Sequence, residues 1–194
     1  MQEPFQIIRD PSSQELLPFE EVVAAYIDSL LAYALWLNHG QREAAEDLLQ
    51  EVFLHAFRNY ASVRSPEKIK AWLFKIMKNL YINETKRLSH RLNISYGDFN
   101  STLLDTKEVG MVATPEEDWL NQRLSKEVEQ ALNSLPAGVR EIVLLFDLEG
   151  FSYKEISEVT GHPLGTVSSK LHRAHRDMRE SLSPYAYRKG ITRE

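Results

Sequence analysis

The chain of 194 residues contains no cysteine. This absence excludes disulfide bonds, thiolate zinc sites and cysteine-based redox sensing. Long hydrophobic runs are missing as well, because the most apolar span, 22–37, is interrupted by Asp28 and Ser29 and is short for a bilayer crossing. The first residues lack the basic and apolar segments of a signal peptide. Together these absences predict a soluble cytoplasmic protein without membrane insertion.

Alternating strand patterns are absent too, and apolar residues recur at steps of three and four, which predicts an all-α fold of two small helical domains joined by a flexible linker. The linker has no helical period, and six acidic residues stand against one lysine from Asp98 to Asp118, a stretch that ends one residue beyond the linker. The pattern predicts five segments: a polar leader (1–17), a first helical domain (18–91), the linker (92–117), a second helical domain (118–182) and a tail with no clear fold (183–194).

Although the formal net charge is −5, two segments of the chain are basic. Between Arg64 and Arg91 eight basic residues stand against two acidic ones, and from His162 to Arg193 seven stand against two. The rest of the chain is therefore strongly acidic. Such a distribution favours two separate nucleic-acid contacts on a protein that also binds a basic partner.

The most informative stretch is 152–176, which reads as a short helix, a sharp turn and a second, basic helix. Ser152 and Glu155 have capping-box spacing, Gly161 allows a positive φ, and Pro163 prevents the first helix from continuing. In the second helix, apolar residues form an inward stripe: Val167, Leu171, Ala174, Met178 and Leu182. Hydroxyls and cations occupy the remaining face, which suits a major groove. We interpret the stretch as a helix-turn-helix; the alternative is an ordinary amphipathic hairpin with a solvated face.

The first domain is predicted to contain three helices. The first spans 19–37, and the second buries Leu48, Leu49, Val52, Phe53, Ala56 and Phe57. The third starts at Pro66 and buries Ile69, Trp72, Leu73, Ile76, Met77 and Leu80. Its other side presents amides and cations: Lys75, Lys78, Asn79, Asn83 and Lys86. On the second helix, Asp47, Gln50 and Glu51 share one polar face because they are spaced i, i+3, i+4.

Two motifs in this order resemble one family. Residues 45–57 and 71–83 resemble region 2 of sigma-70-type transcription initiation factors, and residues 135–156 with 165–173 resemble region 4. Only these two regions are present, which is similar to the extracytoplasmic-function (ECF) subgroup of bacterial sigma factors. The resemblance covers nearly all of 19–182.

The resemblance implies an alternative sigma factor that binds core RNA polymerase, recognises the −10 and −35 promoter elements and helps to melt the promoter. By this resemblance, the residues that bind the clamp helices of the polymerase β′ subunit are Asp47, Gln50 and Glu51. Those that bind the melted −10 strand are Lys75, Lys78, Asn79, Asn83 and Lys86. The −35 element falls to Thr166, Ser168, Ser169, Lys170, Arg173 and Arg176, with Ser169 and Arg173 assigned to bases and Lys170 and Arg176 to phosphates. The chain departs from the family pattern at Asn83, a position that is commonly acidic.

No motif for covalent chemistry is present, so we expect neither enzymatic activity nor a cofactor. His172 and His175 have a spacing that could hold a metal ion, but no third ligand is near, and we favour packing or phosphate roles. The expected partners are core RNA polymerase, promoter DNA and an anti-sigma factor. The competing hypotheses are a helix-turn-helix regulator with an N-terminal dimerisation or sensing domain, and a sigma mimic that titrates an anti-sigma factor.

Overall fold

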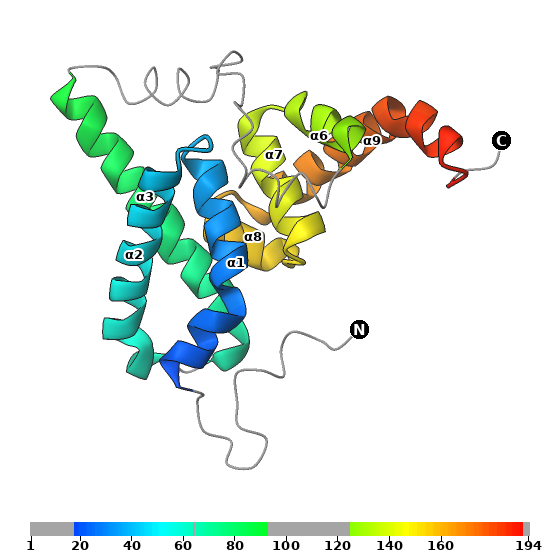
Figure 1. Cartoon of the computed structure of the whole chain (residues 1–194). Helices are drawn as coiled ribbons and strands as arrows, with labels where there is room; N and C mark the ends of the chain where they lie inside the picture. Colours follow the sequence, from blue (N-terminus) through cyan, green and yellow to red (C-terminus); the bar gives the residue numbers. More distant parts are fainter. Residues whose placement is uncertain (1–17, 64, 93–124, 192–194) are drawn as a thin grey trace, which may run out of the picture. The chain divides into compact units, whose positions relative to one another are not determined.

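The computed structural model describes residues 18–63, 65–92 and 125–191, and the chain divides into two compact units, 1–111 and 112–194 (Figure 1). Every regular element of the described residues is helical, which confirms the all-α prediction. The expected leader, nearly all of the linker and the first residues of the second domain lie outside the described residues. Each unit has a core of its own and is described by itself.

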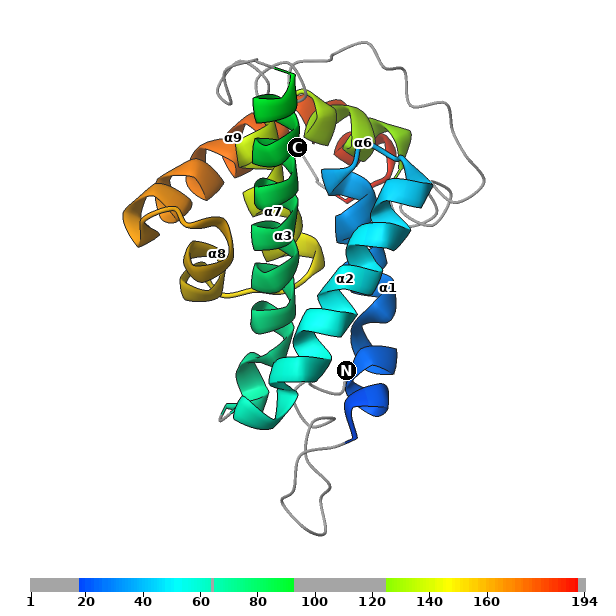
Figure 2. The same cartoon turned by 90° about the vertical axis from the view of Figure 1, so that its left-hand side faces the viewer.

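The described part of the first unit contains three helices, and consecutive helices run antiparallel (Figures 1 and 2): α1 (Phe19–Leu37), α2 (Arg42–Asn59) and α3 (Ile69–Arg91). The turn between α1 and α2 uses positive φ angles of 53° at His39 and 77° at Gly40. Two 3₁₀ turns, η2 (Tyr60–Ser62) and η3 (Pro66–Lys68), lead into α3, so Pro66 starts a 3₁₀ turn rather than the α-helix itself. The core side chains are at most 1% exposed: Val22, Leu30, Val52, Leu73, Phe74 and Met77.

The buried side of α3 differs from the predicted one. Trp72, Ile76 and Leu80, expected in the core, are only half-buried, while Phe74 is fully buried. Phe74 stacks on Tyr33 of α1 at 5.0 Å between ring centroids, and Tyr33 in turn stacks on Trp36 at 5.8 Å. This aromatic stack draws α3 towards α1 and turns Trp72 outward.

The predicted stripe of α2 was wrong at its end. Phe57 is 62% exposed and touches only the rim of the bundle, where its ring meets Phe19 edge-on at 5.5 Å. The inner part of the stripe is buried as expected, at Leu49, Val52 and Ala56. Leu48 and Phe53, also predicted to be buried, are only half-buried, so the buried face of α2 is narrower than the predicted stripe.

The second unit contains α6 (Lys126–Asn133), α7 (Ala137–Val143), α8 (Tyr153–Thr160) and α9 (Leu164–Arg188). After α7, residues Leu144–Leu148 form a π-helical turn, η4. The capping box of α8 is confirmed: the Glu155 N–H donates to Ser152 Oγ at 3.3 Å, and the Ser152 N–H donates to Glu155 Oε2 at 2.8 Å. Gly161 ends α8 with a φ of 75°. The core gathers Ile142, Leu145, Ile156, Val167 and Leu171.

The end of α9 corrects the prediction for the tail. The helix continues through Pro184 to Arg188, so the prediction that 183–194 has no clear fold is wrong for its first half. Proline already has the helical φ, and its missing N–H leaves only the Glu180 carbonyl without its helical donor on an exposed surface. The inward stripe is fully buried only at Val167, Leu171 and Ala174, and Met178 and Leu182 remain half-exposed because the outer helix extends beyond most of the unit.

Candidate protein- and nucleic-acid-binding surfaces

One face of α2 is acidic and open. Asp47, Gln50 and Glu51, here called the acidic face, are all exposed. None of the three has a hydrogen-bond or ion-pair partner among the described residues, whereas Glu46 on the same helix is held by Arg42 at 2.7 Å. Unpaired carboxylates one turn apart can accept charge-assisted hydrogen bonds from a basic helix without first breaking a bond of their own.

The outer side of α3 carries most of the expected −10 residues. Lys75, Asn79 and Lys86 are exposed and share one side of the helix by their spacing of four and seven residues. Trp72 lies one turn before Lys75 on this side, with its indole half-exposed. Lys78 lies apart from them, with its ammonium 5.9 Å from the centre of the Trp36 ring. The side of α3 thus offers cations, one amide and an aromatic surface together.

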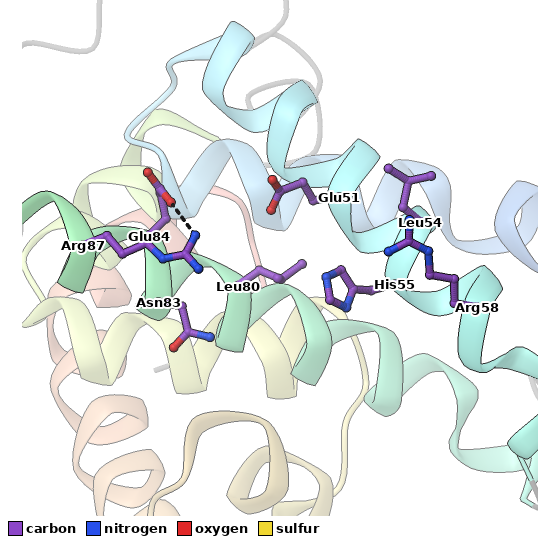
Figure 3. A pocket seen from close by; sticks show the side chains of 8 residues that line it. All are labelled: Glu51, Leu54, His55, Arg58, Leu80, Asn83, Glu84 and Arg87. Carbon is purple, nitrogen blue, oxygen red and sulfur yellow. Dashed lines mark ion pairs between the residues drawn. The ribbon is translucent and has the colours of Figure 1, made fainter.

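Asn83, also expected at the −10 strand, follows Asn79 by one turn and stands at the edge of the same side of α3. It lines a groove of about 360 Å³ between α2 and α3, together with Glu51 of the acidic face (Figure 3). The structure therefore brings together one residue from each of two predicted sites. An apolar side chain that the sequence reasoning missed, Leu54, lines the same groove and is 57% exposed. The sequence does indicate this position of Leu54, because it follows Glu51 by three residues and therefore lies beside it on the helix surface.

The recognition helix α9 presents its predicted polar face to solvent. Ser168, Ser169, Arg173 and Arg176 are exposed, and Thr166 is half-buried. Ser169 Oγ donates to the Thr166 carbonyl at 3.1 Å. The Arg176 guanidinium is paired with its neighbour Asp177 at 3.0 Å. Arg173, by contrast, has no partner among the described residues, so its five N–H donors are available to a base edge.

Lys170 differs from the other cations of α9. It is half-buried, and its Nζ lies 3.2 Å from His162 Nε2 in the turn between α8 and α9. An ammonium has only donors, so Nε2 is the acceptor in this contact. Gly138, at the start of α7, also lies near this ammonium, because a Cβ added there would be 3.9 Å from Lys170 Nζ. Lys170 thus joins the turn to the recognition helix, in addition to the phosphate role predicted for it.

The two histidines of α9 have different surroundings. His172 is exposed, while His175 Nε2 lies 2.8 Å from Asp147 Oδ2 and packs near the Phe146 ring. In the parts of the chain that the structure describes, no three His, Asp or Glu side chains gather as metal ligands. The same parts include no helix with the length and apolarity of a membrane span.

The second unit has the capped short helix, the turn and the cation-bearing second helix of a helix-turn-helix, a motif through which many transcription factors bind DNA. Residues 22–91 match Sigma-70 region 2, and residues 125–178 match Sigma-70, region 4. The chain belongs to the ECF group of sigma-70 RNA polymerase sigma factors, which are initiation factors rather than enzymes. It is thus an alternative sigma factor of transcription initiation.

Individual relatives agree with this assignment. The chain is 31% identical over 168 residues to the ECF RNA polymerase sigma factor EcfG of Rhodopseudomonas palustris, a match that covers 87% of this chain and 84% of that protein. It is 31% identical to the ECF RNA polymerase sigma factor SigE of Mycolicibacterium smegmatis, of which it spans 63%. A solved structure of the sigma factor RpoE with the anti-sigma factor NepR from Bartonella quintana is similar, with a TM-score of 0.62, 25% identity and coverage of 85% of this chain and 96% of that one.

Proposed function

We propose that the protein binds core RNA polymerase in the cytoplasm through its acidic face and carries the polymerase to a two-part promoter. In this proposal α9 enters the major groove of the −35 duplex, with Arg173 on a base edge. The outer side of α3 holds the −10 strand after it has been unpaired, with Asn79 on a base and Lys75 and Lys86 on phosphates. Trp72 adds a surface on which an unpaired base can stack.

One observation carries the proposal: the exposed carboxylates of Asp47 and Glu51 have no partner among the described residues, in the unit that matches region 2. A sensing or dimerisation domain has no need for such a face beside a helix of lysines and asparagines. The region 2 match also disfavours the competing hypothesis of an ordinary helix-turn-helix regulator. A mimic that only titrates an anti-sigma factor would not need the cations of α9.

The test is core binding by a charge-reversed chain. Asp47→Lys with Glu51→Lys should weaken binding to purified core polymerase at least tenfold, because opposite charges become like charges at the interface. Glu20→Lys with Glu21→Lys changes the charge equally at exposed positions of α1 and serves as the control. Circular dichroism verifies that both variants remain helical. Unchanged affinity of the Asp47/Glu51 variant would contradict the proposal.

We further propose that a separate protein regulates this chain by covering these surfaces, since the similar RpoE structure contains the anti-sigma factor NepR. Such a protein would bury the acidic face, Asn79 or Arg173. Purified regulator and core polymerase should then compete for the chain in a pull-down. Simultaneous binding of both would contradict this part of the proposal.

A further inference from the structure

The groove between α2 and α3 has a regular construction (Figure 3). Each helix contributes four residues at positions i, i+3, i+4 and i+7, beginning with Glu51 on α2 and Leu80 on α3. The two rows face each other, so the groove follows the helices over two turns. Its apolar surface comes from Leu54 and Leu80. A volume of about 360 Å³ accommodates one or two side chains rather than a whole helix.

Leu54 is the exposed apolar residue of the groove that a binding partner would cover. Its side chain is 57% exposed, and it follows Glu51 by three residues, so the apolar surface is continuous with the acidic face. Central apolar contacts surrounded by polar ones commonly dominate the energy of a protein interface. An interface that used the acidic face would therefore cover Leu54 as well.

The order of charges along α2 indicates which charges a partner helix needs in order to be complementary. Asp47 and Glu51 precede Leu54, and Arg58 follows it by four residues, with no ion-pair partner among the described residues. Along this side of α2, two acidic residues, a leucine and a basic residue therefore follow one another over about 16 Å of helix. A helix lying along it is complementary if it offers basic residues opposite Glu51, an apolar side chain at Leu54 and an acidic residue opposite Arg58.

We propose that this groove is the apolar anchor point of the polymerase interface: it receives an apolar side chain from the polymerase helix that docks on the acidic face. The inference rests on the proposed function and adds the groove, Leu54 and the reversed charge at Arg58 to it. The groove is occupied in the complex with core polymerase and open in the free chain.

The cysteine-free chain permits a direct test. Leu54→Cys creates a unique thiol, and its rate of alkylation by excess maleimide is followed by the mass of the sigma chain, with and without saturating core polymerase. The rate should fall at least tenfold in the complex. Leu88→Cys, on α3 and 41% exposed but outside the groove, is the matched control and should react equally in both states.

The outcomes separate the inference from the proposed function. Equal alkylation of the Leu54→Cys chain with and without core polymerase, together with loss of binding by the Asp47/Glu51 charge reversal, would overturn the groove and leave the docking face standing. Protection of the introduced thiol that grows with the concentration of the free chain would assign the groove to a second copy and overturn the inference. If Leu54→Cys itself reduces core binding while helicity is retained, Leu54→Met should restore it through its apolar bulk, and failure of that rescue would count against the groove.

Discussion

At the scale of single residues, the cations of α9 differ in what they already contact. The Arg176 guanidinium is engaged by Asp177, and the Lys170 ammonium by His162, whereas Arg173 has no partner among the described residues. A base contact by Arg173 therefore breaks no existing bond. This distinction could not be predicted from the sequence, because spacing alone puts all three on the polar side of the helix.

Arg173→Ala should weaken binding to a −35 duplex by about 1–3 kcal/mol and relax the preference at one or two adjacent base pairs. The measurement is a competition assay with a panel of single-base variants of the duplex, using the full chain. Lys170→Ala provides the contrast: it should weaken all sequences alike and reduce the slope of log affinity against log salt by about one. If the Arg173 variant lost affinity equally for every sequence, its assignment to a base would be wrong.

Tyr26 gives the first unit a dependence on alkaline pH. Burial raises the pKa of Tyr26 above its usual value of 10.0, and the same cause raises the pKa of Tyr60. Below pH 10 both folded and unfolded chains keep the phenol protonated, and above it the unfolded chain ionises first. Stability is therefore lost as pH rises above 10, with a slope of up to about 1.4 kcal/mol per pH unit for Tyr26.

Tyr26→Phe should flatten the fall in the free energy of unfolding between pH 10 and 11, measured by urea denaturation at each pH. Tyr187→Phe changes a side chain that is 62% exposed and serves as the control. The comparison uses the slope against pH, since the loss of a hydroxyl can also shift stability at neutral pH. A fall as steep as that of the unsubstituted chain would contradict the prediction.

At the scale of elements, local chemistry made α8 predictable, whereas longer-range packing decides the orientation of α3. The capping box and Gly161 need only residues close in sequence, and both formed as expected. The orientation of α3 depends on the stack of Phe74 on Tyr33, which a helical period cannot reveal. The π-helical turn after α7 likewise has no signal in the spacing of its apolar residues. Among the site residues, the spacing grouped the acidic face correctly but did not place Asn83 beside Glu51.

Two glycines of the helix-turn-helix offer a matched pair. Gly161 has a φ of 75°, and Gly165 lies in the first turn of α9 without a positive φ; a Cβ would meet no atom within 4 Å at either position. Gly161→Ala should therefore cost about 1–2 kcal/mol through backbone strain alone. Gly165→Ala should cause no loss and gain up to about 1 kcal/mol.

Thermal unfolding followed by circular dichroism checks this pair. Each 1 kcal/mol corresponds to a shift of roughly 4–8 °C for a unit of this size. Equal shifts in both variants would show that crowding rather than backbone conformation decides the outcome at Gly161.

At the scale of the whole molecule, the proposed function assigns promoter opening to the first unit and the −35 contact to the second. Asn79→Ala should spare the closed complex, which depends on α9, and reduce the open complex, because its proposed partner is a base exposed only after unpairing. Permanganate footprinting of the holoenzyme on double-stranded and pre-melted promoters distinguishes the steps. A defect that affects closed-complex formation to the same extent would contradict a role confined to melted DNA.

The uninterrupted course of α9 through Pro184 has a practical consequence. A helix of 25 residues is about 37 Å long. A small rotation of its first turns on binding DNA would therefore produce a large displacement of its last turn. The ion pair of Arg188 with Glu127, at 3.3 Å between exposed side chains, brings that end of α9 against α6. A spin label at Tyr187 would therefore act as a pointer for the orientation of the recognition helix, placed well away from the residues that read the promoter.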